Sequence, residues 1–265
     1  MTSSDIKTAV DLVRSLPSNP ELAEACERYI DRLKGDNNAD FYSNGEFHFL
    51  NRLAPFCQTV FDVGACVGEW TQKFLELKPE AAVHCFEPSG VNQAKLLENL
   101  GGKALINGFA LGEMTGEQTL SVFAEAGTER WELGSLYNHR NPVLGDAVAF
   151  KIQVVSLMDY CRQNRVEHID LLKIDTEGAE MDILSGAREM FAEGRIMAAQ
   201  IEYGGTWLAP RRQLRDVFDL LEGLPYTMAK LMPDRYMVVK NYWPGLDSYL
   251  YSNWVILHDD LVESL

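Results

Sequence analysis

Short apolar runs alternate with helical segments from Thr59 onward, and this alternation constrains the fold more than any other feature. The runs TVFDVG and AAVHCF are each followed by a segment with apolar residues at helical spacing, and KALING, HIDLLKID and IMAAQIEY continue the series. A buried strand followed by an amphipathic helix is the repeating unit of a parallel sheet covered on both faces. The sequence therefore predicts an α/β protein with a Rossmann-like, mostly parallel sheet.

Two segments depart from the alternation. Near the N-terminus, Ser3 to Leu16 and Leu22 to Leu33 have amphipathic helical patterns, and the polar stretch Lys34 to Asn38 has the composition of a linker. We therefore expect residues 1–50 to form a small helical N-terminal segment and residues 51–265 to form the main domain. The segment Phe109 to Ile152 has extended patterns, which predict an antiparallel insertion or a long loop on the substrate side.

The charge balance excludes two classes of partner. The 265 residues include 24 basic and 39 acidic side chains, for a net charge of −15, so the field of the protein repels nucleic acid and anionic lipid surfaces. No apolar run approaches the length of a membrane span and no signal peptide is visible at the start, so we expect a cytoplasmic protein without membrane insertion. The five cysteines form no CxxC pair, which argues against both a disulfide framework and a zinc site.

The first motif, FDVGACVGEW, joins a predicted strand to a predicted helix. In open parallel sheets, ligands bind at the carboxyl ends of strands, where glycine lets the backbone come close to a cofactor. Gly64 and Gly68 fit that role, although glycines at such a position can also serve the turn alone. The next strand ends at Glu87, about 20 residues past the glycines, where a carboxylate commonly binds ribose hydroxyls; the alternative is a solvated glutamate in a loop.

The pattern of the first motif separates two classes of cofactor. Dinucleotide sites use Gly-x-Gly-x-x-Gly to hold a pyrophosphate, whereas this chain has Asp-x-Gly-x-x-x-Gly. S-adenosylmethionine has no pyrophosphate, and its cationic sulfonium and ammonium groups favour nearby carboxylates. Asp62 and Asp175 could supply them, so the sequence favours S-adenosylmethionine.

The second motif, IDLLKIDTEGAE, joins another apolar strand to a helix through a group of acids. Asp175 lies at the carboxyl end of the strand, where a functional side chain is expected. The alternative is helix capping by Asp175 or Thr176, with Glu177 and Glu180 near the positive end of the helix. The two interpretations are compatible, because a capping residue at this edge also faces the cleft.

Together, FDVGACVGEWT and HIDLLKIDTEGAEMDILSGA resemble the FkbM family of class I methyltransferases. Further matches are Asn44-Gly45-Glu46, Ala110-Leu111 with Gly116, and Gly134-Ser135-Leu136-Tyr137, so the resemblance runs from about Phe41 to Asn253. The chain departs from the family at Cys66, where members commonly have asparagine, which bears on any polar contact from that side chain.

The resemblance implies an S-adenosylmethionine-dependent O-methyltransferase of a mainly bacterial family, which acts on a hydroxyl of a sugar, glycolipid, polyketide or related small molecule. We expect a class I methyltransferase fold with seven strands, in which Thr59 to Val63 lies near the centre of the sheet. One strand, near Tyr236 to Lys240 or Trp254 to His258, should run antiparallel at one edge. The expected cofactor contacts are Asp62, Gly64, Ala65, Gly68, Glu87, Ala110 and Asp175.

Methyl transfer to an alcohol requires a collinear arrangement of the reacting atoms and a base for the hydroxyl proton. The strand IMAAQIEY places Glu202 near its carboxyl end, next to the strand that ends at Asp175. We therefore expect Asp175 and Glu202 in the catalytic site, with Glu202 as base or as an anchor for substrate hydroxyls. His139, in the insertion, is a third candidate. Asp175 and Glu202 could also hold a divalent cation through their oxygen atoms, but two acids are too few ligands to assert a metal site, so the predicted site includes none.

Two other functions remain open. A short-chain oxidoreductase would need a helical Tyr-x-x-x-Lys pair, but Tyr236 and Lys240 lie in a β-branched run that favours a strand. A catalytically silent binding or scaffold protein would keep the fold and the cofactor pocket without transferring a methyl group.

Overall fold

The computed structural model describes residues 3–125, 128–137 and 147–262. Their main sheet has eight strands in the order β11-β10-β12-β9-β8-β1-β2-β3. In that order the strands are Arg235–Val239, Tyr226–Met232, Ser252–His258, Ile196–Tyr203, Ile169–Ile174, Thr59–Val63, Ala82–Phe86 and Leu105–Asn107. β1 lies between β8 and β2 and is parallel to both, which confirms the prediction for Thr59 to Val63.

The strand count differs from the prediction, whereas the antiparallel edge strand near Tyr236 to Lys240, one of the two alternatives, is confirmed. β12 is antiparallel to both of its neighbours, β9 and β10, and therefore lies inside the sheet. β11 is antiparallel to β10 and forms the edge. The seven-strand prediction is wrong because β10 and β11 form a hairpin across Pro233 and Asp234, which adds an eighth strand. Tyr236 lies in β11, so the strand interpretation that argued against an oxidoreductase is confirmed.

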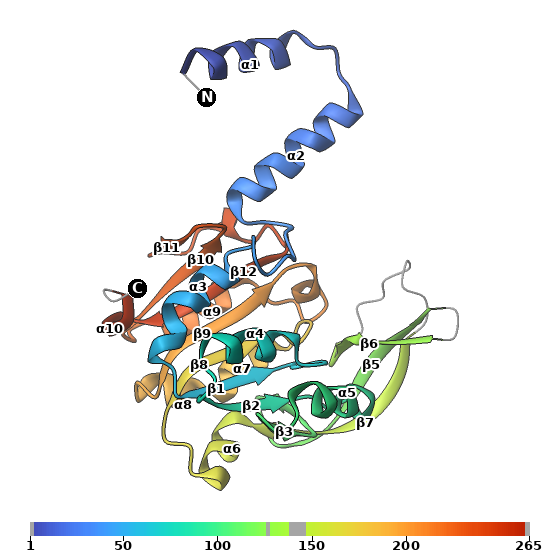
Figure 1. The fold of residues 1–265 in the computed structure, drawn as a ribbon, viewed down its shortest axis with the longest axis vertical. Helices are drawn as coiled ribbons and strands as arrows, with labels where there is room; N and C mark the ends of the chain where they lie inside the picture. Colours follow the sequence, from blue (N-terminus) through green and yellow to red (C-terminus); the bar gives the residue numbers. More distant parts are fainter. Residues whose placement is uncertain (1–2, 126–127, 138–146, 263–265) are drawn as a thin grey trace.

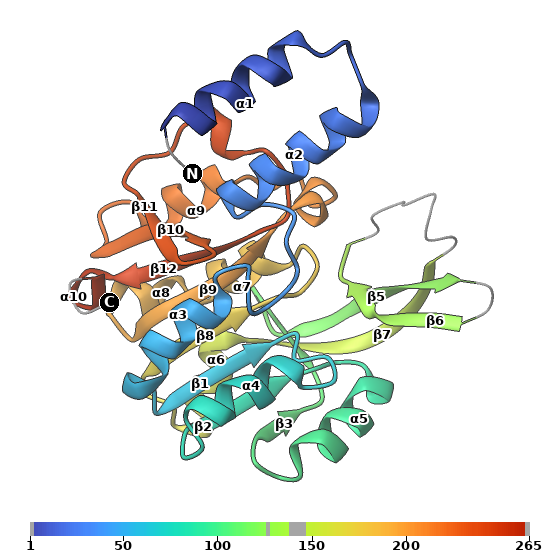
Figure 2. The same ribbon diagram turned by 45° about the horizontal axis from the view of Figure 1, so that its top comes forward.

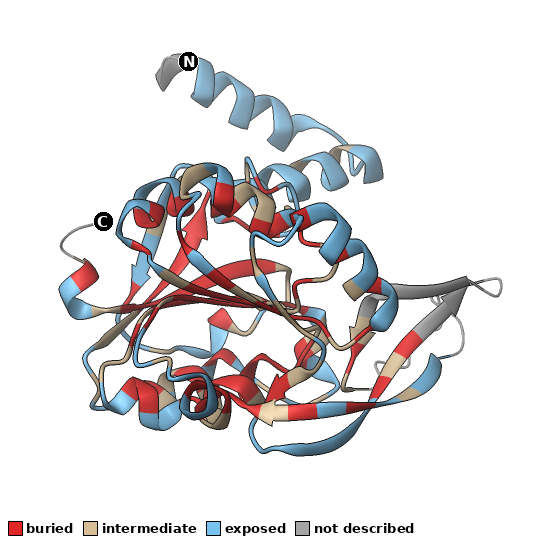
Figure 3. Cartoon of the chain, turned by 60° about the horizontal axis from the view of Figure 1, so that its bottom comes forward, coloured by how far each residue is buried: buried red, intermediate tan, exposed pale blue. Residues whose placement is uncertain are grey.

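Helices cover both faces of the main sheet (Figure 3). One face packs against α6, α7, α8 and α9, and the other against α3, α4, α5 and the short α10. Alternate side chains of each strand reach opposite layers: Val60 of β1 packs in one cluster and Phe61 in the other. In chain order these helices are Glu46–Leu53, Glu69–Leu77, Gly90–Leu100, Leu157–Asn164, Glu180–Gly186, Arg188–Ala192, Leu214–Leu221 and Asp259–Val262.

A second, four-stranded sheet extends from one side of the molecule (Figure 1). Its order is β4-β7-β5-β6, formed by Ala110–Gly112, Ala147–Ser156, Gly116–Glu125 and Thr128–Ser135. β5 is antiparallel to both β6 and β7. The prediction of an antiparallel insertion is therefore confirmed. The end of β6 returns toward the main sheet and reaches its carboxyl edge.

The two N-terminal helices stand away from the main sheet (Figures 1 and 2). They are α1 (Ser3–Ser15) and α2 (Pro20–Lys34). Asn19 caps α2 by accepting hydrogen bonds from two backbone N–H groups, and Pro20 occupies the first turn. α3, in contrast, packs into the core through Phe49, Leu50 and Leu53, and it crosses the expected boundary at residue 50. Within the described residues, no helix is long and apolar enough to span a bilayer.

Candidate active site

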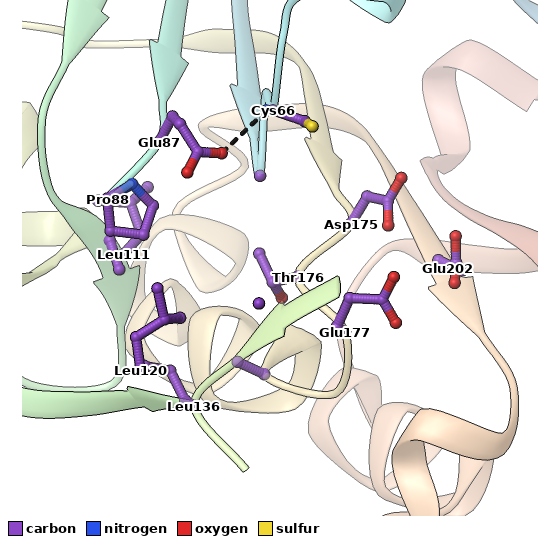
Figure 4. A pocket seen from close by; sticks show the side chains of 14 residues that line it. Cys66, Glu87, Pro88, Leu111, Leu120, Leu136, Asp175, Thr176, Glu177 and Glu202 are labelled. Atoms are coloured by element: carbon purple, nitrogen blue, oxygen red, sulfur yellow. Dashed lines mark hydrogen bonds between the residues drawn. The ribbon is translucent and has the colours of Figure 1, made fainter. Parts of the chain in front are cut away.

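A pocket opens at the carboxyl ends of β1, β2, β8 and β9, where a doubly wound sheet binds its ligands. Figure 4 shows Glu87 on one side of it, a group of acidic side chains on the other, and the apolar side chains of Pro88, Leu111, Leu120 and Leu136 on the side of Glu87. The lining consists of Gly64, Cys66, Glu87, Pro88, Ala110, Leu111, Leu120, Gly134, Leu136, Asp175, Thr176, Glu177, Ala179 and Glu202.

Gly64 lines this pocket, but its neighbours give it a structural reason to be glycine. Its φ is +83°, and a Cβ atom would lie 1.8 Å from the carbonyl oxygen of Asp175. The backbone N–H groups of Gly64 and Ala65 both donate to the carbonyl of Phe86, at 3.0 and 3.1 Å. The turn after β1 is therefore packed between β8 and β2, and only glycine fits at position 64.

Glu87, directly after β2, is buried at one end of the pocket. Its Oε2 accepts from the backbone N–H of Cys66 at 2.9 Å, and its Oε1 accepts from the N–H of Ser89 at 2.8 Å. Burial raises the pKa of this carboxyl to about 7, even though both N–H groups favour the charged form. The side chain of Asn92 also donates to this carboxyl and favours its charged form. The carboxylate is thus held in one orientation by several donors and keeps only part of its capacity to accept further hydrogen bonds.

Asp62 does not line the pocket. Its side chain is fully buried below the turn, where the hydroxyl of Thr71 donates to it at 2.6 Å and the Nζ of Lys173 lies 3.6 Å away. The same ammonium donates to Asp175 at 3.0 Å. Burial alone would lower the pKa of Lys173, but Asp175 and Asp62 raise it. Lys173 is therefore a buried cation that links the first motif to the second.

Three carboxyl groups converge at the other end of the pocket. One oxygen from each of Asp175, Glu177 and Glu202 lies within 4.8 Å of the other two, a group that could hold a metal ion. Asp175 follows β8, and Glu202 lies near the end of the neighbouring strand β9. The structure thus brings together the two acids that the sequence placed in the catalytic site.

Glu177 is the residue that sequence reasoning missed. The helix-capping alternative places it near the start of a helix, but α7 begins only at Glu180, and its N-cap is Ala179. Neither Asp175 nor Thr176 caps this helix. Glu177 has a φ of +55° and is followed by Gly178 at +109°, so the chain turns back and carries the side chain into the pocket. The Glu-Gly pair after Asp175 was the available signal, because such a pair favours a left-handed turn over a helix start.

The close approach of these carboxyl groups raises the pKa values of Glu177 and Glu202. Burial, together with Asp175 and Glu180, raises the pKa of Glu177 to about 8. Burial and the neighbouring carboxylates Asp175, Glu177 and Glu180 raise the pKa of Glu202 well above its usual range. Carboxyl groups this close cannot all ionise without a cation between them, so the cluster holds protons at neutral pH and favours a positively charged ligand.

Neighbouring groups hold the cluster in place. The buried carboxylate of Glu180 accepts from the N–H of Thr176 at 2.8 Å and from the N–H of Gly178 at 3.0 Å, which fixes the loop between them. Ser135, at the end of β6, donates to the carbonyl of Glu177 at 2.6 Å. The indole of Trp207 donates to the carbonyl of Glu202 at 3.0 Å. The acidic side chains therefore project from a rigid backbone.

The remaining residues that the sequence predicts to contact the cofactor, Ala110, Ala65 and Gly68, do not all line the same pocket. Ala110 lines the pocket, whereas Ala65 lines an adjoining cavity that also contains Lys73, Lys95 and Tyr251. Gly68 lies outside both linings; its φ is +89°, and a Cβ atom would lie 2.7 Å from Leu96 Cδ1 of α5. The third catalytic candidate, His139, lies outside the described residues.

Comparison with known proteins gives one relative and several similar folds. The chain is 28% identical to the 2-O-methyltransferase NoeI of Sinorhizobium fredii (strain NBRC 101917 / NGR234) over 172 residues, which cover 61% of this chain and 70% of NoeI. The structure of a methyltransferase FkbM from Methylobacillus flagellatus KT matches with a TM-score of 0.45 and 17% identity over 76% of this chain. This chain spans only 43% of that structure. Cofactor-bound Rv0187 from MTB matches over 98% of both chains with a TM-score of 0.47 and 13% identity.

The chain also matches a family model. The methyltransferase FkbM domain matches residues 62–228, which is more than half of the chain. The match contains the first motif from Asp62 onward and the whole second motif, together with Glu87, Asp175, Glu177 and Glu202. The chain therefore belongs to the FkbM family and is a methyltransferase.

Proposed function

We propose that this methyltransferase uses S-adenosylmethionine to methylate a hydroxyl group of a small molecule. The observation that carries the proposal is that a single pocket has a buried carboxylate at one end and a cluster of three carboxyl groups at the other (Figure 4). A nucleoside suits the first end and a sulfonium cation suits the second. The relative NoeI, which is named a 2-O-methyltransferase, supports oxygen as the methyl acceptor.

The end of the pocket near Glu87 fits the adenosyl half of the cofactor. Leu111, Leu120 and Leu136 form apolar walls, and Ala110 lies beside them. Such walls suit the faces of a purine ring. Because Cys66, Ser89 and Asn92 fix the orientation of the Glu87 carboxylate, its remaining acceptor capacity can bind the ribose hydroxyls.

The end of the pocket near Asp175 fits the reacting centre. When bound, S-adenosylmethionine supplies an electrophilic methyl group on a positively charged sulfur. A positive charge beside Asp175, Glu177 and Glu202 favours their ionised forms, because it relieves the repulsion that raises the pKa values of Glu177 and Glu202. Glu202 then becomes able to accept the proton of a substrate hydroxyl, or to anchor a neighbouring hydroxyl.

The remaining proposed contacts follow from the same placement. Gly64 and Ala65 carry the backbone turn beside Asp175, where the amino-acid half of the cofactor would pass from the pocket to the adjoining cavity. Lys173 keeps Asp175 in position through its 3.0 Å ion pair. The net charge of −15 supports a small hydroxylated substrate over a nucleic acid, since phosphate backbones are repelled.

Two measurements test the proposal. Calorimetry with S-adenosylmethionine should show binding, and label from its methyl group should appear in an ether product when a panel of sugars, glycolipids and polyketides is supplied. Each reaction should be run with Mg²⁺ and after chelation, because the acidic cluster could hold a cation. Absence of cofactor binding would refute the proposal. Binding without transfer to any acceptor would instead support a catalytically silent protein.

A further inference from the structure

Helix α2 carries an apolar stripe that the rest of the chain covers only in part. Leu22, Cys26, Tyr29 and Leu33 follow one another at intervals of four, three and four residues, and Ile30 flanks them. None of the residues of α2 is buried, and Tyr29 and Leu33 are 65% and 55% exposed. Figures 1 and 2 show the helix projecting from the main domain, and Figure 3 shows most of its residues exposed. Leu22 and Cys26 are half-buried.

This spacing is typical of a helix that packs against another helix. Alternating intervals of three and four place the apolar side chains on one seam, as in coiled coils. A helix of 15 residues is only marginally stable in water without such packing. The seam of α2 therefore needs a partner that covers it.

The charges of α2 make that seam complementary to a second copy of itself. The first half of the helix has only acidic charges, Glu21, Glu24 and Glu27, whereas Arg28, Arg32 and Lys34 give the second half a net positive charge. In an antiparallel pair, the acidic half of each helix faces the basic half of the other.

A single antiparallel register satisfies the apolar and the charged positions together. With a two-fold axis between residues 27 and 28, Leu22 of one chain lies opposite Leu33 of the other, and Cys26 lies opposite Tyr29. In the same register Glu21 lies beside Arg32 on one flank. An isologous contact requires this self-complementarity.

The distribution of charge over the whole chain favours the same contact. Residues 3–34 contain six acidic and five basic side chains, in a chain whose net charge is −15. Two main domains therefore repel each other, whereas two N-terminal helical segments do not. α1 adds a second apolar face through Ile6, Val10 and Val13, all of them exposed, and enlarges the surface that association can bury.

We propose that the chain forms a homodimer through its N-terminal helices, with the two α2 helices paired antiparallel about a two-fold axis. Sedimentation velocity of the full chain at about 10 µM should then give twice the chain mass of 29.9 kDa. Leu33→Glu should raise the dissociation constant at least about 100-fold, since two buried leucines are lost from each dimer. Glu24→Gln, on the side of the helix opposite the seam, is the matched control and should leave the dimer intact.

A charge exchange tests the register. Glu21→Arg and Arg32→Glu should each weaken the homodimer, because each places like charges side by side. When mixed, the two variants should form a one-to-one heterodimer. Tyr29→Cys should form an interchain disulfide with Cys26 under mild oxidation, whereas Glu24→Cys should not.

Several results would overturn the proposal. A wild-type monomer at about 100 µM would do so, whether or not α2 then bound lipid vesicles or another protein. So would a dimer that Leu33→Glu leaves intact, because it would have to form through another surface. A folded Leu33→Glu variant, checked by circular dichroism, is needed for that comparison.

Discussion

Replacement of Glu87 tests the link between the structure and the cofactor most directly. Its carboxylate accepts from two backbone N–H groups, those of Cys66 and Ser89, and it is the buried carboxylate at the proposed adenosyl end of the pocket. Glu87→Ala removes the acceptor for the ribose hydroxyls. Glu87→Gln keeps the shape of the side chain but has only one acceptor oxygen, so it cannot bind both N–H groups as the carboxylate does.

The magnitude follows from the loss of hydrogen bonds to a charged group. Such bonds contribute about 1.5–3 kcal/mol, so Glu87→Ala should weaken S-adenosylmethionine binding roughly tenfold to hundredfold. A pH dependence should accompany this effect. Burial raises the pKa of Glu87 to about 7 in the absence of ligand, so the carboxylate that accepts the ribose hydroxyls predominates only above that pH. Cofactor affinity of the wild type should fall as the pH decreases below 7, by up to about tenfold per pH unit.

Isothermal titration calorimetry between pH 5.5 and 8.5 measures both effects. Glu87→Gln should bind more weakly than the wild type at pH 8 and should lose the part of the pH dependence that Glu87 causes near pH 7, while the part due to Glu177 and Glu202 remains. Glu98→Gln, an exposed carboxyl on the neighbouring helix α5, is the matched control and should behave like the wild type. Unchanged affinity in Glu87→Ala would remove this residue from the cofactor site. A flat wild-type profile would refute the link between its protonation and binding.

Three further predictions concern the acidic cluster and the turn beside it. If Glu202 is the base, Glu202→Gln should lower kcat about 10²–10⁴-fold with nearly unchanged cofactor affinity. A higher KM with unchanged kcat would instead make Glu202 an anchor for the substrate. Full activity of the variant would exclude both roles. Without ligand, the melting temperature should fall as the pH rises from 5 to 8.5. The reason is that the pKa of Glu177 is about 8 in the folded protein, above its value in the unfolded chain, so the stability that its proton contributes at low pH is lost as the pH rises through the folded pKa. A wild-type profile no steeper than that of Glu177→Gln would contradict this. Gly64→Ala should prevent folding, since its Cβ would lie 1.8 Å from the carbonyl oxygen of Asp175, whereas Gly102→Ala, at a similar φ of +80° with nothing within 4 Å, should cost only about 1–2 kcal/mol in thermal melts.

The sequence predicted the elements of the main sheet better than their order. Alternating apolar runs and helices identify β1, β2, β8 and β9, because a strand buried on both faces has few polar residues. The position of β12 between β9 and β10 depends on pairing between segments more than 20 residues apart, and the local sequence carries no signal for such pairing. The edge strand β11 was visible as RYMVVK, but β-branched runs do not show which of two candidate segments forms the edge and which lies inside the sheet.

At the site, position along a strand was the reliable signal. Gly64, Glu87, Asp175 and Glu202 were each predicted because they follow or end a strand, and all four line one pocket. Glu177 was missed because its place depends on a left-handed backbone conformation, which removes it from the helix pattern. Residue type alone could not show that the side chain returns toward β9.

The residues of the first motif have two roles: Asp62 stabilises the backbone around the pocket, whereas Gly64 lines it. Asp62 is fully buried and pairs with Lys173, which in turn pairs with Asp175 in the second motif. This chain of charges joins β1 to β8 directly below the acidic cluster. An Asp62 variant should therefore disturb the position of Asp175 without itself touching a ligand, and loss of activity in such a variant would not identify a cofactor contact. Glu87 and Glu202 are more informative targets, because both line the pocket and neither forms an ion pair among the described residues.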